Sequence, residues 1–116
     1  MTTTVSLNES DEGIVSSGGI ATLSVQPQGH GITWHVDSVQ VRASSSLNEG
    51  TCTIYLGTKA ITANYRDETF TGSSGDASDK LQGIEIRQGA VIFAVFSGVD
   101  PGATAYLTVV GTAEVE

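Results

Sequence analysis

Residues 90–110 read AVIFAVF-SGVDPG-ATAYLTVV, and this stretch decides the fold. Residues 90–96 are apolar without a break, which is typical of a central strand that is covered on both faces. Residues 97–102 combine Gly, Asp and Pro, the residues that favour a tight loop. We expect residues 103–110 to form a strand that closes the domain as the hairpin partner of the preceding one.

A composition typical of strands and turns continues towards the N-terminus. Thr, Val, Ile, Ser and Gly dominate, and 14 glycines with only 2 prolines punctuate the chain at intervals that suit short strands. Residues 20–25 read as one strand. Residues 51–56 read as another, because Cys52, Ile54 and Leu56 alternate with polar or aromatic residues, as in a half-buried strand.

A longer strand over Thr33–Ala43 changes phase along its length. Trp34 and Val36 share one face, whereas Val39 and Val41 share the opposite face of a regular strand. Such a change requires a β-bulge, a bend from one sheet into another, or burial on both faces. The sequence leaves these three explanations open.

The remaining segments complete an all-β pattern. We expect a short strand-like piece near residues 60–65, a long polar stretch over 66–80, a strand within 81–86 and a tight turn at Gln88-Gly89. About seven or eight short strands in one domain predict a single antiparallel β-sandwich. We favour a jelly-roll-like topology over an immunoglobulin-like one, because two cysteines around a tryptophan are missing.

The first eighteen residues differ from the rest, so the sequence suggests an N-terminal arm over 1–18 and a sandwich domain over 19–116. The arm is polar and ends in a Ser- and Gly-rich linker. Only residues 4–8 alternate, with Val5 and Leu7 on one side. Two interpretations stand: a frayed terminus, or a flexible docking arm in which Val5 and Leu7 add a strand to a neighbouring protein.

Charge excludes several partners. The net charge is −8, from 13 acids and 5 bases. Nucleic acid and anionic membranes both require Lys and Arg, so we expect no binding to duplex DNA at physiological salt and no membrane partner. Residues 1–15 contain no Lys or Arg and no apolar stretch, which is unlike a signal peptide, and no apolar run reaches the roughly 18 residues of a membrane span.

No residue pattern predicts catalysis or a cofactor. The single cysteine, Cys52, excludes an internal disulfide and a zinc cluster, and we expect it to be a small buried side chain. His30 and His35 flank Trp34, and His35 with Asp37 reads as a surface pair on one strand face. The sequence lacks a nucleophile elbow and a phosphate-binding glycine motif.

Two weaker candidates remain. Asp67, Glu68, Asp76 and Asp79 gather in one polar stretch, where calcium is conceivable, but acidic stretches are usually solvated. We therefore expect no metal site, and no saturable calcium binding with a midpoint below about 10 micromolar. The aromatic residues can line a sugar-binding surface, although a core of this size needs most of them.

Residues 33–114 resemble small β-sandwich virion proteins that tailed bacteriophages encode. The segments that carry the resemblance are Gln88-Gly89-Ala90, Ile92–Phe96, Gly98–Ala105, Gly111–Glu114, Thr33–Val36, Cys52–Tyr55 and residues 70–79. The resemblance implies a capsid decoration (cement) protein, or a neck or tail accessory protein, with no enzymatic activity.

It also implies the partners: the protein itself, as a homotrimer, and the major capsid protein. The expected location is the virion, after synthesis in the host cytoplasm. A glycan-binding or attachment module of the tail or neck is the alternative that the same resemblance leaves open.

Overall fold

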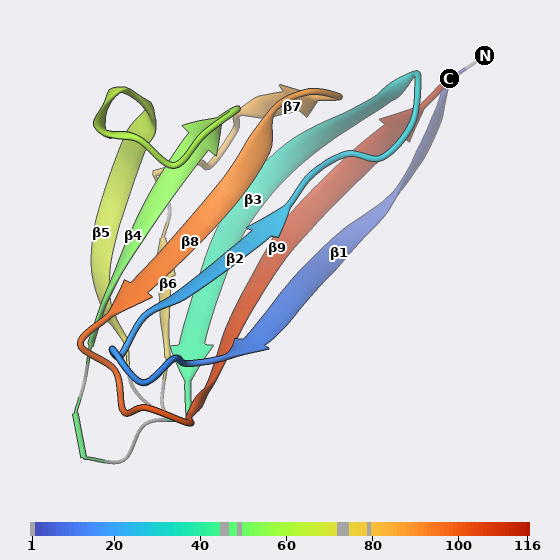
Figure 1. Cartoon of the computed structure of the whole chain (residues 1–116). Coiled ribbons are helices and arrows are strands. Elements are labelled where there is room, and N and C mark those ends of the chain that lie inside the picture. Colours follow the sequence, from blue (N-terminus) through green and yellow to red (C-terminus); the bar gives the residue numbers. More distant parts are fainter. Residues whose placement is uncertain (1, 45–46, 49, 72–74, 79) are drawn as a thin grey trace.

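The computed structural model describes residues 2–44, 47–48, 50–71, 75–78 and 80–116. Two antiparallel sheets pack face to face and enclose one hydrophobic core (Figure 1). The long sheet contains β1 (Thr3–Ile14), β9 (Thr104–Val115) and β3 (Ile32–Ala43), with β6 (Asp76–Ser78) and β7 (Glu85–Arg87) both pairing with β3. The short sheet contains β2 (Ala21–Val25), β8 (Val91–Ser97), β4 (Gly50–Gly57) and β5 (Tyr65–Thr71).

The chain crosses between the sheets as a jelly roll does. Strands β1 to β4 alternate between the long and short sheets, and the last strands return beside the first, β9 against β1 and β8 against β2. The predicted jelly-roll-like sandwich is confirmed, and the immunoglobulin-like alternative does not fit this strand order.

One predicted pairing is wrong. The loop after β8 passes to the other sheet, so β9 pairs with β1 and β3 instead of forming a hairpin with β8. The sequence marks the loop correctly, but loop residues do not reveal which sheet the next strand joins.

The change of phase in β3 is a β-bulge. The pairing of β3 with β9 shifts between Val36 and Ser38, so Asp37 is the extra residue. The bulge turns Trp34, Val36, Val39 and Val41 to the same inner face, where all four are buried. Of the three explanations that the sequence leaves open, the β-bulge is therefore the correct one.

Residues 3–14 are an edge strand of the sandwich, and the prediction of a flexible arm over them is wrong. All 12 residues of β1 lie in register with β9, from Thr3 opposite Val115 to Ile14 opposite Thr104. Leu7 is only 5% exposed. The sequence argument considered apolar burial alone, whereas a strand is also held by its main-chain hydrogen bonds to a neighbour.

The polar middle of the chain contains two strands that the sequence does not mark. The piece expected near residues 60–65 is a 3-10 turn over Thr62–Asn64, and β5 and β6 lie within the polar stretch 66–80. Both strands are at sheet edges, where polar residues are tolerated. None of the described residues belongs to a helix with the length and apolar character needed to span a bilayer.

Candidate interaction surfaces

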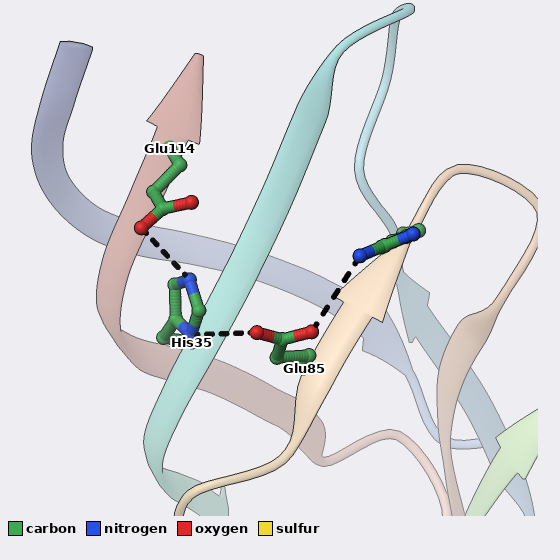
Figure 2. Close-up of polar contacts among 4 residues, drawn as sticks. His35, Glu85 and Glu114 are labelled. Atoms are coloured by element: carbon green, nitrogen blue, oxygen red, sulfur yellow. Dashed lines mark ion pairs between the residues drawn. The ribbon is translucent and has the colours of Figure 1, made fainter. Parts of the chain in front are cut away.

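A charged cluster lies on the outer face of the long sheet, where His35 of β3 stands between two glutamates (Figure 2). Nδ1 of His35 is 3.8 Å from Oε1 of Glu85 in β7, and Nε2 is 3.4 Å from Oε1 of Glu114 in β9. Arg87 lies 3.8 Å from the other oxygen of Glu85. The sequence predicts a surface pair of His35 and Asp37. Asp37 is instead the extra residue of the bulge and has no partner in β9, and His35 contacts the two glutamates.

This cluster does not have the geometry of a catalytic site. Nε2 of His35 has no hydrogen-bond partner among the described residues, so it contacts no nucleophile there. Both glutamates and Arg87 are exposed, and ion pairs between exposed groups stabilise a fold by less than about 1 kcal/mol. The cluster is therefore a surface feature in which the two glutamates and Arg87 face solvent while the Nε2 atom of His35 is shielded from it.

Two acidic residues of the polar stretch, Asp67 and Asp76, are hydrogen-bond acceptors that join the two sheets. Ser78 of β6 donates from Oγ to Oδ2 of Asp67 in β5 at 2.5 Å, and Thr69 of β5 donates from Oγ1 to Oδ2 of Asp76. Thr69 and Ser78 are buried, so these bonds close one open side of the sandwich.

The acidic residues considered as calcium ligands are not shown to come together in one site. Glu68 is exposed on the opposite face of β5 from Asp67, and Asp79 lies outside the described residues. Within the described part of the chain, no three His, Cys, Asp or Glu side chains form a group that fits a metal ion. The absence of tight calcium binding stays a prediction.

Cys52 is fully buried on the inner face of β4, as the sequence predicts. Burial, with a smaller effect from the Asp67 carboxylate, raises the pKa of its thiol from 9.0 to about 12. A thiol in this environment stays protonated and does not act as a nucleophile.

We expect the free energy of unfolding to fall as the pH rises above 9.0. Below that value Cys52 is protonated in both states; above it the unfolded chain loses the proton while the folded chain keeps it, at about 1.4 kcal/mol per pH unit. Urea titrations from pH 8 to 10.5 would measure this slope. Cys52→Ala should lower stability at pH 8, where the thiol is protonated in both states, but lack the Cys52 contribution to the slope; identical slopes in the two proteins would contradict this account.

The outer face of the short sheet carries an apolar surface that the described residues do not cover completely. Val91, Phe93 and Val95 of β8 point outward and are half-buried. Tyr55 of β4 lies opposite Phe93 on one side and opposite Tyr65 of β5 on the other. Phe93, Tyr55 and Tyr65 therefore form a row across three strands, which we call the aromatic row.

The sequence signal for this surface is the unbroken apolar run of β8. It correctly indicates a central strand, since β8 lies between β2 and β4, but it also predicts cover on both faces. Only the inner face is fully covered within the described chain, because the outer residues of β8 and Tyr55 are half-buried and Tyr65 is 46% exposed.

A shallow depression of about 470 Å³ lies on the outer face of the long sheet, beside Tyr106. The guanidinium of Arg42 stands 4.2 Å from the centre of the Tyr106 ring. A sugar would have to displace Arg42 to stack on that face of the ring. This depression is thus a poorer sugar platform than the aromatic row.

Two loops at one end of the sandwich are bonded to each other. Asp100 accepts hydrogen bonds from the backbone N–H groups of Leu47 and Asn48, at 2.9 and 3.1 Å, and from the side chain of Asn48. Leu47 is 87% exposed, so this end presents an apolar side chain from a backbone that is held in place.

The two residues proposed for docking differ in exposure, although both face the inner side of β1. Leu7 is in the core, and Val5 is 45% exposed beside a groove of about 340 Å³. Trp34 and Ala113 of the long sheet also line the groove, together with Gln26 and Gln28, which follow β2. Docking through these residues therefore has to occur from an ordered strand.

Two solved structures are similar to this one over the whole chain. A chain of the empty head of turnip yellow mosaic virus has a TM-score of 0.54 and 12% identity, with 100% of this chain and 82% of that chain covered. A chain of turnip yellow mosaic virus has a TM-score of 0.52 and 12% identity, with 99% and 93% covered. The chain shares their fold.

The sequence matches no family model, and no curated protein is similar enough to count as a relative. At 12% identity, the similarity to the viral chains concerns the fold and carries no residue roles with it.

Proposed function

We propose that this chain is a non-enzymatic structural protein of a virion that decorates the capsid and stabilises it by binding its assembled surface. The uncovered outer face of β8 carries the proposal. Val91, Phe93 and Val95 of this central strand are only half-buried, and such a surface gains free energy when a partner protein covers it. Binding only the assembled state would stabilise the shell by mass action.

Other observations support the same role. The fold is shared with chains of a virus structure, and the sequence resembles virion proteins of tailed bacteriophages, which favours a phage capsid. The surface clusters described above serve as ion pairs or as links between strands, and none has the geometry of a catalytic site.

We propose a homotrimer as the assembled form, with the major capsid protein as the second partner. Burial of the β4 and β5 part of this face, which includes Tyr55 and Tyr65, between copies would leave the outer residues of β8 for the capsid protein. This arrangement needs neither a nucleic acid nor a membrane, in agreement with the net charge of −8.

The double variant Phe93→Ser, Val95→Thr tests the proposal. Both residues point away from the core, so we expect the fold to persist while binding to particles assembled without this chain weakens by at least about tenfold. Co-sedimentation with such particles measures binding, and analytical ultracentrifugation measures the trimer. Val110→Thr, a half-buried outward residue of β9, is the matched control and should behave as the unaltered chain.

If the double variant binds particles as tightly as the control, this face is not the contact. If the unaltered chain does not bind particles at all, the decoration role itself is wrong.

The aromatic row also favours a second candidate, glycan binding at a tail or neck. Rings in line across Phe93, Tyr55 and Tyr65 offer flat apolar faces on which sugar rings can stack. A glycan array would distinguish the two candidates. Specific binding that Tyr55→Ala abolishes, with no binding to capsids, would support the attachment module over the decoration protein.

A further inference from the structure

We propose that the free edge of β1 pairs with β1 of a second copy of this chain, antiparallel, about a two-fold axis at Ser6. This contact goes beyond the proposed function, because it uses another surface than the aromatic row. It would hold whether or not the protein binds a capsid. Figure 1 shows β1 at the margin of the long sheet, with β9 on its other side.

The other sheet edges are short, covered or charged, as is usual where edge pairing is avoided. β6 and β7 have three residues each. β2 has five, and Oδ2 of Asp11 accepts a hydrogen bond from the N–H of Ser24 at 3.1 Å, which occupies part of that edge. β5 carries Arg66, Asp67 and Glu68 in succession.

β1 differs from these edges in length and in charge distribution. It has 12 residues, and its acids, Glu9, Asp11 and Glu12, are confined to the second half. Residues 3–8 read TTVSLN and carry no charge. This uncharged half presents a row of main-chain groups on the side away from β9, which is a template for another strand.

The charge pattern favours pairing of a second copy through the uncharged half of β1, and an axis at Ser6 lies within that half. A two-fold axis perpendicular to the sheet keeps each face of the sheet continuous, so directly opposite residues must point to the same face. With the axis at Ser6, Thr4 lies opposite Asn8 of the second copy and Thr3 lies opposite its Glu9. No acid then faces an acid, whereas an axis at Glu9 or beyond would place like charges opposite each other.

The same register covers one of the two exposed apolar side chains of β1; the other, Ile14, lies in the second half of the strand. Val5, 45% exposed on the inner side, lies opposite Leu7 of the second copy. The grooves of about 340 Å³ beside the two β1 strands would then meet at the axis, and their apolar linings would become continuous. Because the paired segment is short, we expect the contact to be weak and concentration dependent in solution.

A cysteine placed on the axis tests the contact directly. Ser6→Cys brings two thiols opposite each other at a Cα separation of about 4.5–5.5 Å, which suits a disulfide. Under mild oxidation we expect a disulfide-linked dimer at least about tenfold faster than with Ser10→Cys. Ser10 is the matched control, because it is an exposed serine on the same face of β1 in the acidic half. Cys52 does not interfere, since it is fully buried.

A charge exchange at Ser6 provides the second measurement. Ser6→Lys and Ser6→Glu should each lower self-association in sedimentation, because like charges then face each other, and an equal mixture of the two should restore it. If Ser6→Cys links no faster than Ser10→Cys, the axis is not at Ser6. If neither charge variant changes self-association, β1 does not pair with itself. Both outcomes are independent of particle binding, so they leave the decoration role to its own test.

Discussion

A chain that lacks residues 1–18 is expected to be unfolded. The deletion removes all of β1, and with it the ladder of 12 residue pairs that covers one side of β9. It also removes Leu7 and Val15 from the core. Loss of one buried leucine costs about 2–5 kcal/mol, and a domain of this size has only about 5–15 kcal/mol of stability in total. Circular dichroism and the dispersion of amide NMR signals would show the loss of folded structure.

Two smaller changes at the N-terminus serve as comparisons for the 1–18 deletion. Leu7→Ala alone should lower the free energy of unfolding by about 2–4 kcal/mol, because it opens a cavity between the sheets. Deleting residues 1–2, which precede β1, should leave the melting temperature unchanged. If the 1–18 deletion instead melts as the full chain does, the strand contributes little and the free-arm interpretation of the sequence is correct.

Gly111→Ala is expected to destabilise the domain by about 3 kcal/mol or more, through a clash with backbone atoms. Gly111 lies in β9 opposite the β3 bulge. A Cβ atom there would be 2.1 Å from the carbonyl oxygen of His35 and 3.0 Å from the amide nitrogen of Asp37. Those atoms belong to the backbone of a central strand, so relief requires the bulge itself to move. Urea denaturation would measure the change.

The matched control for Gly111 is Gly18→Ala. Gly18 is exposed, and a Cβ atom there would have Ser16 Oγ at 3.8 Å as its nearest neighbour, an ordinary contact. We expect a change of less than about 0.5 kcal/mol in that variant. A Gly111→Ala protein as stable as the Gly18→Ala protein would mean that β9 and the bulge do not approach as closely as the structure shows.

Much of the fold follows from local patterns in the sequence. The alternation in β4, the phase change in β3 and the turn at Gln88-Gly89 are each set by side-chain periodicity or by a turn residue, and all three are present. The pairing of strands that are distant in the sequence does not follow from such local patterns. That β9 joins β1 and β3 depends on contacts between residues about 60 to 110 positions apart, and no local pattern encodes them.

For the candidate surfaces too, the sequence predicts the local strands but not which faces and edges their neighbours cover. The run of apolar residues in β8 predicts a central strand with cover on both faces, but it does not show that the described chain fully covers only the inner one. The alternation of Val5 and Leu7 indicates a strand. That its neighbour is β9 of the same chain became clear only from the structure, because β1 owes its place to main-chain bonds that side-chain polarity does not reveal.

The pairing of β1 with β9 also places both ends of the described chain together. Thr3 lies opposite Val115, and Figure 1 shows the two termini side by side. The loops that contain Leu47 and Asp100 lie at the opposite end of a molecule 50 Å long. A peptide or enzyme fused to either terminus would therefore be displayed from the same end of the domain. A short linker from residue 115 to residue 3 would also permit a circularly permuted chain, opened in the exposed turn at Thr58–Ala60.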